Sequence, residues 1–194
     1  KLKVIKAHYE DLESRKAELE ELILALAAPY QQELAILQTA PGISSIFTAI
    51  GIISEIGTNM EAFPSAKHLC SWAGLTPTNN ESAGKKKSVR VSKAGCYIKP
   101  LLVQCANAVV TSKKHPEIRN RYLRLKKRRG HKKAIIAIAR MLLTALYHML
   151  KNGENYNAEL YRKSDLPPVD REITVEQAII IARNQGYRIK SATA

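Results

Sequence analysis

Hydrophobic residues recur at alternating steps of three and four along the first 28 residues, and charged residues fill most of the other positions. This spacing predicts an amphipathic helix with a heptad seam, which Pro29 is expected to end. Lys16 takes an a-type position, where a polar residue lowers stability but fixes register and partner choice. We therefore expect residues 1–28 to form a coiled coil that makes the chain a homo-oligomer; a helix buried in the domain core is the alternative. The seam consists of Leu2, Ile5, Tyr9, Leu12, Lys16, Leu19, Ile23 and Leu26.

Residues 34–57 read as two short apolar helices joined by Pro41-Gly42 and closed by Gly57. The segment resembles a helix-hairpin-helix unit, in which a glycine turn and the following helix N-terminus direct backbone N–H groups at a DNA phosphate. Gly42 and Ser44 are then candidate nucleic-acid contacts, with Ser44 at the place of the usual second glycine. A plain helical hairpin in the core is the alternative.

Four further segments have helical spacing, and the stretch between the first two of them does not. Ser65 is a candidate N-cap for the first helix, Pro100 is tolerable in the first turn of the second, and Gly130 separates the last two. Residues 76–93 are polar and lack helical periodicity, which predicts an exposed loop or irregular hairpin. The expected helical segments are 66–72, 95–112, 115–129 and 132–150.

The predicted fold is a mostly α, compact helical domain with an N-terminal coiled-coil helix and a C-terminal appendage. Its expected divisions are residues 1–28, the main domain 29–160 and a linker with a small helical tail, 161–194. Within the tail, residues 174–177 have capping-box spacing before a short helix. The first residue already lies in the helical pattern, so we expect the chain to be a fragment of a longer protein.

Positive charge is concentrated in one part of the chain. The whole sequence has 31 Lys or Arg against 17 Asp or Glu, a net charge of +14, yet residues 85–133 contain 17 of the bases and one acid, Glu117. So one-sided a segment repels itself unless a polyanion is its partner, which favours nucleic acid over a solvated basic face or an anionic membrane. The candidate contacts are Lys85, Lys86, Lys87, Arg90, Lys93, Lys99, Arg124, Lys126, Lys127, Arg128, Arg129, Lys132 and Lys133.

The remaining composition narrows the classes of protein and of site that the sequence allows. No apolar run reaches the roughly 20 residues that span a bilayer, so we expect no membrane partner and a cytoplasmic, nucleoid-associated protein. Cys70, Cys96 and Cys105 have no CxxC spacing and no histidines at zinc-finger distances, so they are expected to be ordinary thiols. No cofactor is expected within this chain.

Several phrases occur in an order that resembles one family. Residues 73–95 read AGLTPTNNESAGKKKSVRVSKAG, and PGI and FPSAKHL precede them. Together they resemble the C-terminal transposase domain of the "one-ten" insertion-sequence family of bridge-RNA-guided DEDD transposases, over residues 34–156. The resemblance implies that Ser82 becomes covalently joined to DNA, that DNA and a guide RNA are partners, and that an N-terminal RuvC-like domain holds Mg²⁺ on four carboxylates.

No counterpart of that RuvC-like domain occurs in the chain, so we expect the fragment to be inactive alone. The predicted function is the C-terminal part of a transposase that binds DNA and guide RNA and supplies Ser82 as nucleophile. The lysines after Ser82 are expected to stabilise negative charge at the attacked phosphate. A non-catalytic helix-hairpin-helix nucleic-acid-binding module is the main alternative, and an RNA-packing scaffold that dimerises through the first helix is the third.

Overall fold

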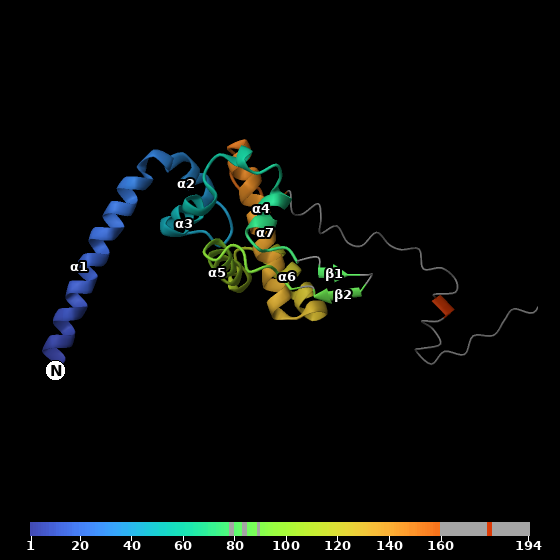
Figure 1. Ribbon diagram of the computed structural model, residues 1–194, viewed down its shortest axis with the longest axis horizontal. Helices are drawn as coiled ribbons and strands as arrows, with labels where there is room; N and C mark the ends of the chain where they lie inside the picture. The colour runs from blue at the N-terminus through green and yellow to red at the C-terminus, as the bar shows by residue number, and fades with distance from the viewer. Residues whose placement is uncertain (78–79, 83–84, 89, 160–177, 180–194) are drawn as a thin grey trace, which may run out of the picture. The chain divides into compact units, whose positions relative to one another are not determined.

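The computed structural model describes residues 1–77, 80–82, 85–88, 90–159 and 178–179, with side chains described outside 78–89. The chain divides into two units, Lys1–Tyr156 and Asn157–Ala194. The first is helical apart from one short β-hairpin, so the predicted mostly α fold is confirmed (Figure 1). Its elements are α1 Leu2–Ala27, η1 Ala28–Tyr30, α2 Gln31–Gln38, α3 Ile46–Ile56, η2 Met60–Ala62, α4 Ala66–Trp72, β1 Asn80–Ser82, β2 Lys85–Ser88, α5 Ile98–Thr111, α6 Pro116–Arg129 and α7 His131–Asn152.

Helix α7 is the centre of the core. It packs against α2, α4, α5 and α6, and its apolar side chains recur at helical spacing on the sides that face them. Ile138 and Leu142 in this helix are almost completely buried. The Tyr147 hydroxyl donates to the Phe63 carbonyl at 3.1 Å, which ties η2 to the same helix. The predicted helix 132–150 is therefore confirmed, as the core of the unit.

By length and composition alone α7 could cross a membrane, with a mean hydropathy of 1.4 over its most apolar window. Of that window, 56% is buried inside the protein. A helix surrounded by α2, α4, α5 and α6 meets the same criteria because it fills a core. We therefore describe α7 as a core helix.

The sequence places the other helices within a few residues of their observed ends. Ser65 is the residue before α4, as predicted, although its hydroxyl contacts His68 Nδ1 at 2.9 Å instead of a backbone N–H. Gly130 separates α6 from α7 with φ +80°. Most of the predicted tail helix lies outside the described residues. Within it the structure describes residues 178–179, which are helical.

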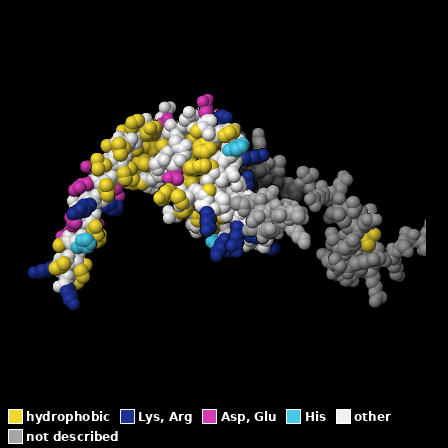
Figure 2. All heavy atoms as spheres, viewed as in Figure 1, with side chains coloured by type: hydrophobic (Ala, Val, Ile, Leu, Met, Phe, Trp, Pro, Cys, Tyr) yellow, Lys and Arg dark blue, Asp and Glu magenta, His cyan; other side chains and the backbone are white. Residues whose placement is uncertain are grey.

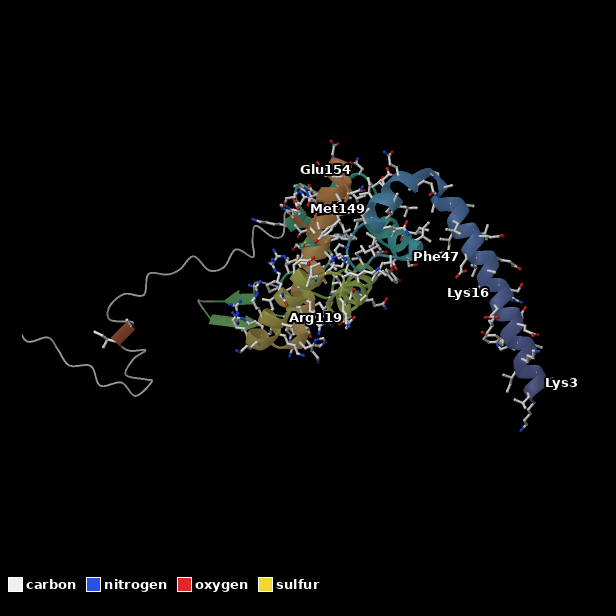
Figure 3. All side chains as sticks on the ribbon, turned by 180° about the vertical axis from the view of Figure 1, so that it is seen from behind. Lys3, Lys16, Phe47, Arg119, Met149 and Glu154 are labelled. Atoms are coloured by element: carbon white, nitrogen blue, oxygen red, sulfur yellow. The ribbon has the colours of Figure 1, made fainter. Side chains whose placement is uncertain are left out.

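Helix α1 is exposed along nearly its whole length. Of its residues only Ala27, at the C-terminal end, is buried, while Leu2, Leu12 and Leu26 are 84%, 51% and 77% exposed. Figure 3 shows Lys3 and Lys16 on this helix with their side chains in solvent. Ion pairs four residues apart, such as Arg15 with Asp11 at 3.0 Å, each support an isolated helix by about 0.3–0.5 kcal/mol. The heptad seam is thus uncovered in a single chain, and the coiled coil remains a prediction.

Candidate functional site: a serine hairpin and a basic corner

Ser82 lies in the hairpin formed by β1 and β2, which we call the serine hairpin. The two strands pair antiparallel, with Ser82 opposite Lys85 and Asn80 opposite Ser88. A register shift between Asn80 and Glu81 makes the ladder irregular. Residues 76–93, predicted as a loop or irregular hairpin, therefore contain an irregular hairpin. The backbone brings Ser82 beside the first residue of the lysine-rich strand, Lys85–Ser88.

Two glycines bring the ends of this segment into backbone contact. A Cβ on Gly95 would lie 2.3 Å from the Ala73 carbonyl oxygen, and a Cβ on Gly74 would lie 2.4 Å from the Ala94 carbonyl oxygen. Both glycines have positive φ, +66° at Gly74 and +67° at Gly95. Only glycine permits so close an approach in this conformation. We call this contact between residues 73–74 and 94–95 the glycine crossing; the sequence analysis did not find it, although Gly74 and Gly95 bracket the polar segment.

The side chain of Lys99, in the first turn of α5, contacts the residues of the glycine crossing. Its ammonium donates to the Ser92 carbonyl oxygen at 2.6 Å, and Nζ would lie 2.9 Å from a Cβ on Gly74. The side chain is half-buried, whereas Arg90 and Lys93 are exposed. The structure thus gives Lys99, a predicted nucleic-acid contact, a hydrogen bond within the protein. The side chains of Lys85, Lys86 and Lys87 lie outside the described part of the chain.

The strongest described concentration of charge is at the junction of α6 and α7, which we call the basic corner. Figure 2 shows Lys and Arg side chains gathered at the end of the body where Figure 1 draws α6 and the start of α7. Arg119, labelled in Figure 3, is exposed on α6 as well. Among the described residues, the lysines at this corner form no ion pair with an acid. The predicted contacts that the structure brings together here are Arg124, Lys126, Lys127, Arg128, Arg129, Lys132 and Lys133, all exposed.

The basic corner is held in place by a pair that the sequence did not reveal. The Tyr122 hydroxyl and His131 Nδ1 are hydrogen-bonded at 2.8 Å, and their rings meet edge to face. Lys126 Nζ lies 5.8 Å from the centre of the Tyr122 ring, within the range of a cation–π contact. Since Tyr122 is buried, it anchors the middle of α6 to the first turn of α7. Nine residues separate Tyr122 from His131 across a helix break, so helical periodicity gave no signal of the contact.

Charge at the corner agrees with the helix dipole on one side and opposes it on the other. Basic residues end α6, where the partial negative charge of the helix C-terminus stabilises them. Lys132 and Lys133 stand in the first turn of α7, where the N-terminus disfavours cations. No side chain caps this turn, since Gly130 is the N-cap. Exposed N–H groups and ammonium groups together suit a phosphate.

Gly42 and Ser44 lie in the turn between α2 and α3, the predicted helix-hairpin-helix segment. Gly42 has φ +81°, and a Cβ on it would lie 2.5 Å from the Cys105 carbonyl oxygen in α5. The turn is therefore packed against α5, and this packing alone requires glycine. Ser44 is exposed, and its carbonyl accepts from Gln38 Nε2 at 3.3 Å. Contact of the turn with DNA remains a prediction.

The cysteines are all free. Cys70 and Cys105 are buried and Cys96 is exposed. Burial raises the pKa of the Cys105 thiol to about 11, so it stays protonated and unreactive at neutral pH. Among the residues that the structure describes, no three His, Cys, Asp or Glu side chains group closely enough to hold a metal ion.

Comparison with known proteins shows which family the central part of the chain resembles. Residues 34–123, which include the α2–α3 turn, the serine hairpin, the glycine crossing and most of α6, match the Transposase IS116/IS110/IS902 family. The Insertion element IS110 uncharacterized 43.6 kDa protein of Streptomyces coelicolor is 29% identical over 127 residues, which are 64% of this chain and 30% of that protein. The chain thus spans less than a third of this relative's length. No solved structure gives a significant match. Over residues 34–123, less than half of its length, the chain is thus similar to transposases of the IS116/IS110/IS902 family.

Proposed function

We propose that this chain is the DNA-handling part of a transposase, and that it binds DNA and a guide RNA and supplies Ser82 as the nucleophile for strand cleavage and transfer. The observation that carries the proposal is the place of Ser82. It stands opposite Lys85 in a lysine-rich hairpin within the residues that match the transposase family.

The proposed reaction is attack of the Ser82 hydroxyl oxygen on a DNA phosphorus. A bond forms between that oxygen and phosphorus, the bond to one sugar oxygen breaks, and the strand is left joined to the protein through phosphoserine. The serine proton must pass to a base and the leaving oxygen must gain a proton. No histidine occurs between His68 and His115 in the sequence, so the base has to come from another part of the fold or of the enzyme.

We propose that this help comes from a RuvC-like domain outside these residues. In the described part of the chain, no three His, Cys, Asp or Glu side chains lie close enough together to hold a metal ion. A metal held by that domain would polarise the phosphate and stabilise the leaving oxygen. This chain's own contribution is to hold the backbone in line, through the cations of the hairpin and the basic corner.

The basic corner supports nucleic acid as the partner. Its side chains come from the end of α6 and the start of α7, and the hydrogen bond between Tyr122 and His131 links the two helices, so the charges lie on one surface. Phosphate contacts of this kind position a duplex or a folded RNA without reading its sequence. We propose the guide RNA or the DNA ends as the polyanion bound there.

Substituting Ser82 with alanine tests the proposal in the intact transposase. Ser82→Ala should abolish the covalent protein–DNA adduct, seen as a shifted band after denaturation, and leave nucleic-acid affinity within about twofold because phosphate contacts dominate binding. Ser88→Ala and Ser92→Ala are matched controls in the same segment and should still form the adduct. Loss of the adduct only in a control variant would move the nucleophile to that serine, and an adduct in all three would end the serine mechanism.

A second candidate is a non-catalytic helix-hairpin-helix module. It is favoured by the α2–α3 turn, because the exposed N-cap residue of α3, Ser45, makes no side-chain cap and leaves first-turn N–H groups for a phosphate. This reading expects full nucleic-acid binding and no adduct in the unaltered protein. The adduct assay therefore separates the two candidates.

A further inference from the structure

Lys99 differs from the other basic residues of the segment in where its charge is directed. Its ammonium is half-buried and donates to the Ser92 carbonyl at 2.6 Å, a short, charge-assisted hydrogen bond. It reaches this oxygen through the space left by Gly74, whose missing Cβ would stand 2.9 Å from Nζ. By contrast, Lys93 on the same segment is exposed.

We infer that Lys99 is a positioning residue: it fastens the base of the serine hairpin to the helical core, and thereby fixes where Ser82 stands. The inference rests on the proposed function for the role of Ser82. The fastening itself rests on the contacts of Lys99, Gly74 and Gly95 alone.

Both ends of the fastening are anchored. On the core side, Ile98 and Leu102, which flank Lys99 on α5, are fully buried. The Lys99 backbone N–H also donates to the Gly95 carbonyl at 3.0 Å. The lysine backbone is therefore fixed to the glycine crossing, and its side chain bridges from there to the returning arm of the hairpin.

From Ser92 the constraint passes up the hairpin by backbone pairing. The next residue, Val91, bridges Pro77 on the opposite arm. Further along, Asn80 pairs with Ser88 and Ser82 pairs with Lys85. The register shifts between Asn80 and Glu81, so the constraint passes through these paired positions and not through an unbroken ladder. Loss of the hydrogen bond from Lys99 to Ser92 would thus make the base of the serine hairpin more mobile, and with it the position of Ser82.

The alternative is that Lys99 serves as one more phosphate contact, and the two roles predict different measurements. A phosphate-contacting lysine contributes about 0.9 to the slope of log affinity against log salt. A fastening lysine contributes to the protection of the hairpin base from hydrogen exchange. Each quantity can be measured on this chain without any chemistry at Ser82.

The test compares three variants of the chain. Lys99→Met keeps most of the stem and removes the ammonium, Lys99→Arg restores a cationic donor, and Lys67→Met removes an exposed charge from α4 as the control. Lys99→Met should speed amide exchange in peptides covering residues 90–95 by about tenfold and leave the salt slope for double-stranded DNA unchanged. Lys99→Arg should regain most of the protection, and Lys67→Met should alter neither quantity.

The inference is overturned if Lys99→Met lowers the salt slope by about 0.9 while exchange at residues 90–95 is unchanged, since the lysine then binds phosphate. It is also overturned if Lys99→Arg fails to restore protection. In the intact transposase, Lys99→Met should slow adduct formation at saturating DNA with unchanged affinity. If the exchange results hold but the unaltered transposase forms no adduct, the serine chemistry fails and the fastening of the hairpin stands.

Discussion

Replacing Gly42 with alanine asks why the turn between α2 and α3 has a glycine. With φ +81°, an added Cβ would stand 2.5 Å from the Cys105 carbonyl oxygen and 3.2 Å from its carbon. Both are backbone atoms of α5, so no side chain can rotate away. The turn or the helix must shift by about 0.9 Å to bring the 2.5 Å separation to the 3.4 Å of ordinary van der Waals contact.

The expected loss of stability has two parts. Left-handed backbone at a residue with a Cβ costs about 1–2 kcal/mol, and overpacking a rigid neighbour costs about 1–3 kcal/mol more. Lower entropy of the unfolded alanine chain offsets about 0.4–1 kcal/mol. Gly42→Ala should therefore destabilise the fold by about 1–5 kcal/mol. Gly153→Ala is the matched control, because Gly153 has left-handed backbone, φ +66° and ψ +32°, with nothing within 4 Å of an added Cβ, and it should cost about 1 kcal/mol.

Urea unfolding of both variants, followed by circular dichroism, measures the difference as a shift in midpoint at constant slope. A larger loss at Gly42 than at Gly153 supports packing against α5 as the reason for the glycine. If the two variants lose the same stability within about 0.5 kcal/mol, the argument from packing is wrong. If Gly42→Ala also loses DNA affinity while remaining folded, the helix-hairpin-helix interpretation gains instead.

Three further predictions concern the interface, the assembly and the thiols. Replacing the four basic residues at 126–129 with glutamine should lower the salt slope of nucleic-acid binding by about 3–4, and an unchanged slope would locate the phosphate contacts elsewhere. Deleting residues 1–28 should reduce the molar mass measured by light scattering from that of an oligomer to that of a monomer. A chain that is monomeric with and without these residues contradicts the coiled coil. At neutral pH iodoacetamide should label Cys96 in the folded chain and Cys105 only after unfolding, because the Cys105 thiol is buried with its pKa raised to about 11; mass spectrometry of the digest checks this.

Most of the fold could be predicted because each helix has a recognisable pattern in its own local sequence. Apolar spacing located α7, and single residues such as Pro29 and Gly130 marked where helices end. The strands were harder, since Asn80–Ser82 and Lys85–Ser88 are short, polar and irregular in register. A pair of strands without an apolar face has no period-2 pattern to recognise.

Only two parts of the site could be predicted from the sequence: the run of basic residues, and Ser82 within a motif that resembles a known family. Charge counting indicated the basic corner, because a run of bases needs no three-dimensional information. The roles of Gly42 and Lys99 could not be predicted in the same way. Each depends on a backbone carbonyl brought close by folding, that of Cys105 in one case and of Ser92 in the other. Sequence shows which residue type is present, and the fold shows which neighbour requires it.

Because α7 opens at the basic corner and then runs through the core, occupancy of the surface and stability of the interior are thermodynamically linked. A polyanion that binds only the folded chain at 100 times its dissociation constant would add about 2.7 kcal/mol to the free energy of unfolding. The linkage works in both directions: a cavity made at Ile138, deep in the core, would loosen the helix that presents Lys132 and Lys133. Variants selected for weak nucleic-acid binding should therefore include substitutions at buried positions that no phosphate could reach.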